Sequence, residues 1–566
     1  MFDSFHSGIF FRMFMLATVS CGMHPGAACE AQQAQESHTV AGVVRNSMTG
    51  QPIARALVDG QADATLTDNQ GRFELHLSQR FANLQVRRPG YTSRENGRMH
   101  AFNLEDAETT NLTLYLTPTA TITGHVVAEN GGDPNNVFFQ VYRKRSVRGH
   151  ERWIPMGGAE TNSDGIFKMF DVEAPANYVL CSHSHREQAI VVAPGKTISG
   201  YGYPSQCYPS GMTGGADVLN LSAGQQAEVE IPLARQPFYQ VTIAEPNYPL
   251  GGQNGVNVQI MQQDGLSANA PVQWNAQART AEIYLPNGNY YAEGRSGGQT
   301  KAYGRVDFKV ADMPLQSLRL VVLPLVPVPV EFHKEFANEA DAKSKAGAVS
   351  FSVIQGNGMN RHADIGLQLE LMPLDRITET ALGIGLHYPD GVEDGDQLEL
   401  DGVTPGRYWV LASYFRPGYI SAITSAGVDL TKDPLVVGAG NNVAPIQVTV
   451  RNDGGHIDCT VNSPSPPHRI GGYSIGASGV VVYAIPAGPR VSPIPQAGVA
   501  MDGRTQIANL APGTYRVIAL EAYRDLDSMD TNDLSQLAEK GKTVTVAAGE
   551  TVSVQVDVTR SEEQNP

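Results

Sequence analysis

The sequence has few charged residues and no run of basic side chains. Only 17% of its 566 residues are charged, and the net charge is −16. A protein that follows a nucleic-acid backbone needs clustered lysine and arginine. Nucleic acid is therefore excluded as a partner, and the acidic balance is explained by solubility.

Long apolar runs are also missing after the amino terminus. The strongest one, Leu318 to Val330, is interrupted by three prolines. It is shorter than the ~20 residues that a membrane-spanning helix needs. We expect no transmembrane segment in the mature chain, and we interpret this block as the last strand of one domain leading into the first strand of the next.

The amino terminus has the pattern of an export signal. An apolar run follows Arg12 and leads to small residues around Ala31, which predicts a signal peptide over residues 1–31. The mature protein would then be secreted or periplasmic. Lipid attachment at Cys21 is a minor alternative, because the residues before it, Thr18 to Ser20, match the usual lipoprotein pattern poorly.

Cysteine is scarce. Once the predicted signal peptide is removed, Cys181, Cys207 and Cys459 remain. In an oxidising compartment the first two, which flank a loop rich in Gly, Pro and Tyr, are the natural disulfide pair. Cys459 is then expected to be an unpaired thiol buried in a core.

Glycine and proline are abundant, with 58 and 35 residues. This composition favours turns and short strands over long helices, so we predict an all-β fold. The best helical segment is short and runs from Asp533 to Lys540, with Leu534 and Leu537 on one face and Gly541 as its end.

One stretch, LELDGVTPGRYWV at 398–410, is repeated along the chain. QIANLAPGTYRVIAL at 506–520 is nearly the same, and weaker copies lie at 167–180 and 281–293. Alternating apolar residues around a Pro-Gly turn predict a β-hairpin. The tyrosine after the turn is expected to bury its ring and to bond main chain through its hydroxyl; these tyrosines are Tyr178, Tyr290, Tyr408 and Tyr515.

The tyrosines recur about 110 residues apart, which is a domain period. We therefore predict tandem Ig-like or transthyretin-like (prealbumin-like) β-sandwiches, joined as a string with interfaces small enough to flex. The predicted ranges are 38–118, 119–236, 237–325 (the most degenerate), 326–452 and 453–560, followed by a tail at 561–566. The second range contains a long polar insertion at 143–152.

The segment from Val40 to Leu116 resembles the carboxypeptidase regulatory-like domain, a transthyretin-like sandwich. The motifs that carry this resemblance are Thr49 to Ile53, Thr67 to Phe73 and Pro89 to Tyr91. The later repeats look like tandem domains of this kind in secreted proteins of soil bacteria, especially Acidobacteria. The resemblance implies a non-catalytic accessory module, and no cofactor.

The zinc site of a carboxypeptidase needs His and Glu three residues apart. None of the fourteen histidines has this pattern, so peptidase activity is disfavoured. Two weaker metal patterns are His183 and His185 beside Cys181, and the acidic loop of Asp390, Asp394 and Asp396. We interpret the first as part of a disulfide region and the second as a solvated turn, so no metal site is predicted.

Gly472 to Gly476 fits the Gly-x-Ser-x-Gly pattern around Ser474. In a serine hydrolase that pattern lies between a parallel strand and a helix, whereas no helical segment follows it here. A hydrolase is therefore the least favoured hypothesis.

Tyr201, Tyr203 and Tyr208 form a cluster that could stack on sugar rings. The other interpretation is a disulfide-bonded loop that packs between domains. Our leading hypothesis is a non-catalytic, exported binding or scaffolding protein with an unknown envelope protein or glycan as partner. The alternative is a carbohydrate-binding protein, since the sandwiches also resemble starch-binding-like domains.

Overall fold

The computed structural model describes residues 38–559 except for a set of internal gaps. The gaps are 62, 79–80, 94–99, 104–109, 130, 188–197, 210–216, 245–255, 264, 276, 297–300, 337–364, 377, 380–384, 390–391, 393–394, 441–442, 463–479, 501 and 521–522. Among the described residues the regular secondary structure is almost entirely strand, which confirms the all-β prediction. No helix in this part of the chain is long and apolar enough to cross a membrane.

The first unit (38–118) has the strands β1 (His38–Asn46), β2 (Leu57–Asp59), β3 (Ala64–Leu66), β4 (Arg72–Leu77), β5 (Phe81–Arg87), β6 (Tyr91–Thr92), β7 (His100–Asn103) and β8 (Leu112–Pro118). They form the sheets β4-β1-β8-β6 and β3-β2-β5-β7. Val44, Leu75 and Leu84 are among the buried residues that pack between these strands.

The second unit (120–234) has the strands β9 (Ala120–Glu129), β10 (Phe138–Val147), β11 (His150–Glu160), β12 (Ile166–Val172), β13 (Ala176–Ser182), β14 (His185–Arg186), β15 (Gly200–Tyr203), β16 (Cys207–Tyr208), β17 (Leu219–Leu221) and β18 (Gln226–Ala234). One sheet is β12-β9-β18 and the other is β11-β10-β13-β16, with β17 on β13. Strands β14 and β15 instead extend a sheet of the next unit.

The third unit (236–324) has the strands β19 (Gln236–Ala244), β20 (Val256–Gln262), β21 (Gln273–Asn275), β22 (Thr280–Leu285), β23 (Gly288–Ser296), β24 (Ala302–Val310), β25 (Leu315–Arg319) and β26 (Leu323–Pro324). Its sheets are β14-β15-β19-β22-β21, with β25 on β19, and β20-β23-β24-β26.

The fourth unit (328–451) has the strands β27 (Val328–Glu335), β28 (Leu367–Pro373), β29 (Leu386–His387), β30 (Gln397–Leu400), β31 (Gly406–Tyr414), β32 (Tyr419–Ser425), β33 (Val428–Asp429), β34 (Leu435–Val437) and β35 (Ile446–Arg451). Its sheets are β29-β30-β27-β35-β32-β33 and β28-β31-β34. The apolar block at 318–330 thus covers the end of β25, β26 and the start of β27, as the sequence predicted.

The fifth unit (455–559) has the elements β36 (Gly455–Asn462), β37 (Val481–Pro486), β38 (Gln496–Gly498), β39 (Arg504–Leu510), β40 (Gly513–Leu520), the 3₁₀ helix η1 (Leu526–Ser528), α2 (Thr531–Glu539), β41 (Lys542–Val546) and β42 (Thr551–Thr559). Its sheet order is β38-β37-β40-β42-β36-β39, with β41 on β40. The predicted helix is confirmed but starts two residues earlier, because the Asp530 side chain accepts a hydrogen bond from the Asn532 amide and caps it.

Each unit closes in the same way: its first strand pairs in parallel with its last long strand. The pairs are β1 with β8, β9 with β18, β19 with β25, β27 with β35, and β36 with β42. Each unit, from its first strand to the parallel partner of that strand, contains a separate cluster of buried apolar residues. Each of these parallel pairs lies within one of the five ranges expected from the sequence. The division into five domains itself stays a prediction.

The repeated Pro-Gly stretch is a corner between two sheets, so the hairpin interpretation is wrong. Strand β30 pairs with β27 and β29, whereas β31 pairs with β28 and β34. The same separation holds for β12 and β13 and for β22 and β23, so the chain crosses from one sheet to the other at these copies. In the fifth unit β39 and β40 belong to one continuous sheet but do not pair with each other, since β39 pairs with β36, and β40 pairs with β37, β41 and β42.

The tyrosine after each corner has the role expected of it. Tyr408 donates to the carbonyl of Thr404 at 2.7 Å, and Tyr515 donates to the carbonyl of Ala511 at 2.6 Å. Tyr290 bonds the Pro286 carbonyl at 3.2 Å, and Tyr178 bonds the carbonyl of Glu173. All four rings are buried. Each hydroxyl therefore satisfies a main-chain carbonyl of the corner while its ring joins the core.

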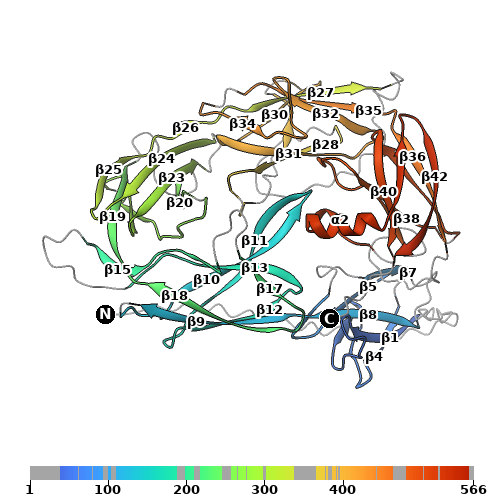
Figure 1. Ribbon diagram of the computed structural model, residues 1–566, viewed down its shortest axis with the longest axis horizontal. Coiled ribbons are helices and arrows are strands. Elements are labelled where there is room, and N and C mark those ends of the chain that lie inside the picture. The colour runs from blue at the N-terminus through green and yellow to red at the C-terminus, as the bar shows by residue number, and fades with distance from the viewer. Residues whose placement is uncertain are drawn as a thin grey trace, which may run out of the picture.

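The units follow a ring in Figure 1, with β11 and α2 directed toward its middle. The tip of the β10–β11 hairpin reaches the fifth unit, where the Arg148 amide donates to the Asp527 carbonyl at 3.1 Å. Arg152, on β11, donates to the carbonyl of Pro373 in the fourth unit at 2.6 Å. The predicted string is therefore wrong at this point, because the polar insertion of the second unit bonds two units distant in sequence.

Candidate functional site

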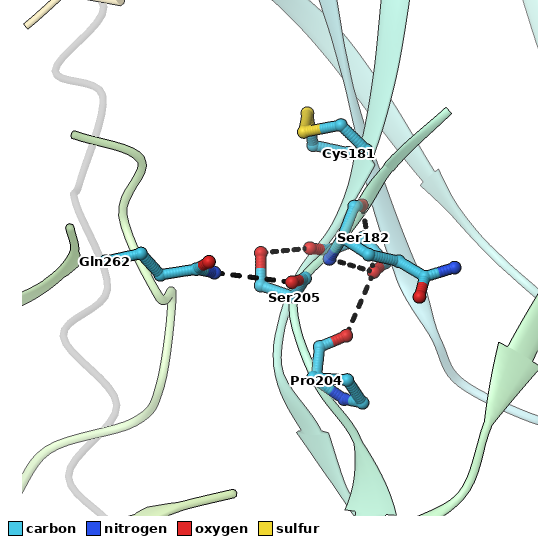
Figure 2. The surroundings of a disulfide bond; sticks show 7 residues. Cys181, Ser182, Pro204, Ser205 and Gln262 are labelled. Carbon is cyan, nitrogen blue, oxygen red and sulfur yellow. Dashed lines mark hydrogen bonds between the residues drawn. A yellow bond between two sulfur atoms is a disulfide. The ribbon is translucent and has the colours of Figure 1, made fainter. Parts of the chain in front are cut away.

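The predicted cysteine pair forms a disulfide. Cys181 on β13 and Cys207 on β16 are direct cross-strand partners, with Cα atoms 4.0 Å apart. Figure 2 shows the surrounding bonds, in which the Ser205 hydroxyl donates to the Ser182 carbonyl at 2.7 Å and the Gln262 amide donates to the Ser205 carbonyl at 3.3 Å. Since Gln262 belongs to the third unit, this bonded loop also lies between two units, as one interpretation of the sequence predicted.

The three loop tyrosines do not form a sugar-stacking surface. The ring of Tyr203 is 0% exposed and belongs to the core of the second unit, and Tyr208 packs against the same core. The guanidinium of Arg235 covers Tyr201, 4.6 Å from the ring centroid. The predicted cluster of Tyr201, Tyr203 and Tyr208 is therefore wrong as a stacking platform, because burial removes its central ring from any ligand.

His183 and His185 do not join Cys181 in a metal site. Cys181 is oxidised in the disulfide and so has no thiolate to offer. The ring of His183 packs against Phe138 with centroids 4.5 Å apart, and burial lowers the pKa of both histidines. Over the described residues, no group of three or more His, Cys, Asp or Glu is arranged to hold a metal ion.

Several sequence-predicted residues lie outside the described part of the chain. These are Cys21 and the signal peptide, Ser474 with its flanking glycines, and Asp390 and Asp394. Asp396 is described, and its carbonyl accepts a hydrogen bond from the amide of Phe332 at 2.8 Å. Cys459 is buried and unpaired as expected, and burial raises the pKa of its thiol to about 12.

The main cleft lies where the second, fourth and fifth units meet. Its volume is about 660 Å³, and the residues that line it come from the β10–β11 tip, from β31 and the 430–432 segment, and from the 485–491 segment and α2. His150 stacks on Trp409 with ring centroids 4.5 Å apart. The stack joins the second unit to the fourth at the wall of the cleft.

Local backbone geometry places the hairpin tip. Val147 and His150 are the last paired residues, so Arg148 and Gly149 form a two-residue loop, and both have positive φ (50° and 90°). Tight hairpins need this conformation, which glycine adopts freely. A Cβ at position 149 would make only an ordinary contact, 3.8 Å from a guanidinium nitrogen of Arg490, so the positive φ and not a lack of space favours glycine here.

Side chains then fix the tip. Arg148 donates to the carbonyl of Val491 at 2.8 Å and to the hydroxyl of Ser413 at 3.1 Å. Arg490 pairs with Asp527 at 3.1 Å. Burial, with added contributions from Arg152 and Arg490, lowers the pKa of His150 to about 4. His150 is therefore neutral at pH 7 and is a stacking group there rather than a cation.

A smaller cavity of about 180 Å³ lies beside the disulfide loop, between the second and third units. Its lining is mostly neutral and polar, and includes Ser184, Gln236, Gln262 and Asn289 next to Tyr290. Side-chain amides and hydroxyls can both donate and accept hydrogen bonds. This cavity can therefore bind a small neutral polar group.

The sequence showed little of either cavity. The polar insertion at 143–152 was visible, but its partners, such as Val491, lie hundreds of residues away. No local pattern indicates which distant loop such a tip contacts. The Pro-rich segment at 486–490 was the other available signal, since prolines there interrupt the chain directly after β37.

No family model matches this chain, and no curated protein matches it. Solved structures that resemble it include the Bacillus anthracis TIE protein, at 14% identity over 51% of each chain with a TM-score of 0.15. A streptococcal ancillary pilin aligns at 14% identity over 57% of this chain and 99% of its own, with a TM-score of 0.16.

The shaft pilin SpaA from Lactobacillus rhamnosus GG aligns at 12% identity over 37% of this chain and 98% of its own, with a TM-score of 0.13. This chain spans about half the length of the Bacillus anthracis protein. Similarities this weak say nothing of what the chain binds. From its own strands and sheets, the chain is an all-β protein built of repeated β-sandwiches.

Proposed function

We propose that this chain is a non-catalytic, exported binding protein of the cell envelope or extracellular space, and that its ligand occupies the cleft between the second, fourth and fifth units. The observation that carries this proposal is that three units contribute side chains to one cavity of about 660 Å³. Ligand sites are commonly cavities of about 300–1,000 Å³, with apolar walls and a few placed polar groups, and they lie between domains.

The polar groups at the cleft support binding rather than chemistry. The Ser535 hydroxyl donates to the Thr531 carbonyl at 2.9 Å, within the helix. His150 is stacked and neutral, and its pKa is far below the range that suits a general base at pH 7. The disulfide fits an oxidising compartment, which supports export.

A cavity-filling variant tests this proposal. Ser535 is exposed on α2 and lines the cleft, whereas its neighbour Gln536 is also exposed but does not line it. Ser535→Trp should block the cleft, and Gln536→Trp is the matched control. Native mass spectrometry after incubation with a small-molecule extract of the culture medium should show adducts on the wild type and on Gln536→Trp that Ser535→Trp lacks. Identical adducts on all three proteins would contradict the proposal.

A specific observation favours a second function, carbohydrate binding, at the smaller cavity. Gln236, Gln262 and Asn289, which have side-chain amides, line that cavity together with Tyr290. Neutral amides suit the hydroxyls of a sugar. A glycan array should then give signals that Asn289→Ala abolishes and that Ser535→Trp leaves unchanged; an array without signal would remove this alternative.

Two further proposals from the sequence remain. The first unit is proposed to be a carboxypeptidase regulatory-like domain, on the motifs between Thr49 and Tyr91. A serine hydrolase at Ser474 is the least favoured function, and esterase activity lost in Ser474→Ala would establish it.

A further inference from the structure

The wall of the main cleft carries an excess of positive charge, although the whole chain carries −16. Arg148, Lys432, Arg490 and Arg516 line it, and Glu539 is the one carboxylate among the lining residues. The carboxylates that pair with these cations, Asp527, Glu370 and Asp429, are not among the lining residues. The surface that a ligand meets is therefore more basic than the junction as a whole.

Burial disfavours the charge of three guanidiniums at this junction: Arg148 and Arg490, which line the cleft, and Arg152, which does not. Arg152 is only 3% exposed, its main interunit partner is the Pro373 carbonyl, and no carboxylate of the described chain lies within 4.0 Å of it. Burial lowers the pKa of Arg152 to about 10. Burial is also the largest influence on Arg148 and Arg490, whose pKa values are lowered despite nearby carboxylates. A nearby anion would stabilise all three cations.

Arg516 is the cation best placed to reach a ligand. It lies on β40 and lines the cleft, and its guanidinium donates to the hydroxyl of Thr543 at 2.6 Å. Within the described chain it has no carboxylate at ion-pair distance. Its charge is therefore available to an incoming group, since a neutral hydroxyl leaves that charge uncompensated.

The wall also has apolar residues. Trp409, Leu430, Pro486, Pro489 and Ala538 line it. A ligand that has only charged groups would leave these apolar side chains exposed to water. A ligand that is only apolar would leave the guanidiniums without a counter-charge. Both parts of the wall are satisfied by one molecule that has an apolar body and an anionic group.

We propose that the cleft binds an amphipathic anion: a small molecule with an apolar body seated near Trp409 and an acidic head group bonded by Arg516 and the neighbouring guanidiniums. This inference rests on the proposed function, because it names the ligand class of the same cleft. Charge complementarity with the cationic wall and the volume of the cleft select a small organic acid over a neutral sugar or a folded protein.

Two dyes test the head group separately from the cleft. The anionic probe is 8-anilinonaphthalene-1-sulfonate, and the neutral probe is Nile red. Binding is followed by energy transfer from tryptophan in a Trp274→Phe background, because Trp274 is 40% exposed and distant in sequence from the lining residues. The remaining tryptophans are Trp153 and Trp409.

Arg516→Gln should weaken sulfonate binding about tenfold, or about 1.4 kcal/mol, and leave Nile red binding unchanged, because only the sulfonate loses a charged hydrogen-bond donor. Arg504→Gln is the matched control, because it removes an exposed charge from the same unit away from the cleft. Equal sulfonate affinity in the two variants would overturn the inference.

Ser535→Phe fills the cleft without adding a tryptophan donor, so it tests the binding site separately from the ligand class. If it displaces both dyes, the cleft is a binding site and the arginine comparison decides the ligand class. If it displaces Nile red while the sulfonate is insensitive to Arg516→Gln, the binding site stands and the anionic ligand is excluded. If it affects neither dye, the proposed function fails together with the inference.

Discussion

Two junctions in the described part of the molecule contain buried arginines, and they differ in the groups that surround the positive charge. Between the third and fourth units, Glu293 on β23 is 2% exposed and bonds Arg376, Arg295 and the Tyr303 hydroxyl, the last at 2.7 Å. Glu379 adds a second carboxylate 3.2 Å from Arg376. Each charge in this network has an opposite charge within 4.0 Å.

Between the second, fourth and fifth units, main-chain carbonyls replace many of the carboxylates. Arg152 bonds the Pro373 carbonyl, and Arg148 bonds the carbonyl of Val491. The pKa directions follow from this difference. Burial alone would lower the pKa of Arg376, but Glu293 and Glu379 outweigh burial and raise that pKa. At Arg148 burial is the stronger influence, so the pKa is lowered.

This difference indicates that the junction between the third and fourth units is structural, whereas the junction between the second, fourth and fifth units can bind a ligand. A compensated buried network holds two units in one orientation and leaves nothing for a ligand to neutralise. A junction with surplus positive charge next to a cavity has both the space and the electrostatic need for one. Three predictions test this difference, in order of expected effect.

Glu293→Gln should be the most damaging change. It breaks the pair between the buried Glu293 and the buried Arg376, which keeps only Glu379 as a carboxylate partner, and breaking a buried ion pair costs about 3–5 kcal/mol. Urea denaturation at pH 7 measures this loss of stability. Asp307→Asn is the control, because its pair with Arg305 is exposed and should contribute less than about 1 kcal/mol. Equal effects of the two substitutions would show that the network does not hold the joint.

Arg152→Met should cost far less than Arg376→Met. Removing Arg376 leaves the buried Glu293 with one guanidinium, for a loss of about 3–5 kcal/mol. Removing Arg152 takes away a desolvated cation and its hydrogen bonds to the carbonyls of Pro373 and Glu151, which costs about 1–2 kcal/mol. Matched denaturation curves give both numbers, and a larger loss for Arg152→Met would reverse the comparison.

The junction between the second, fourth and fifth units should lose stability in mild acid. The pKa of His150 is lowered from 6.5 to about 4, mainly by burial and then by Arg152 and Arg490. Between those pH values His150 binds a proton in the unfolded chain but not in the folded one. The contribution of His150 to the free energy of unfolding is therefore complete above pH 6.5 and is lost as the pH falls toward 4. Asp527 acts in the opposite direction, because burial raises its pKa.

The informative quantity is therefore the difference between the wild type and His150→Gln. Thermal unfolding from pH 7 to pH 4.5 should show a steeper loss of stability in the wild type than in the variant. Parallel pH profiles would contradict the assignment of this sensitivity to His150.

Much of the architecture was predictable because its signals are local. Turn residues and buried tyrosines recur in the sequence, and Tyr408 and Tyr515 have the contacts expected of them. Alternating apolar residues reveal which face of a strand is buried but not which strand pairs with it. The corners were therefore mistaken for hairpins, since β30 and β31 are adjacent in sequence and lie in different sheets.

The candidate site was beyond sequence reasoning for a related reason. Arg148, Trp409 and Arg490 each look like ordinary surface residues of separate repeats. They meet only because a two-residue turn at Arg148 and Gly149 projects the β10–β11 hairpin to loops of two other units. The loop tyrosines were conspicuous in sequence, but Tyr203 packs in the core.

The central claim is that the β10–β11 tip holds the second unit against the fifth. Spin labels on Met156→Cys of β11 and Gln536→Cys of α2 test it, since both positions are exposed. Buried Cys459, whose thiol pKa is about 12, should stay unlabelled. Pulsed electron spin resonance should give one narrow distance distribution; a broad one, as in a flexible string of sandwiches, would contradict the account.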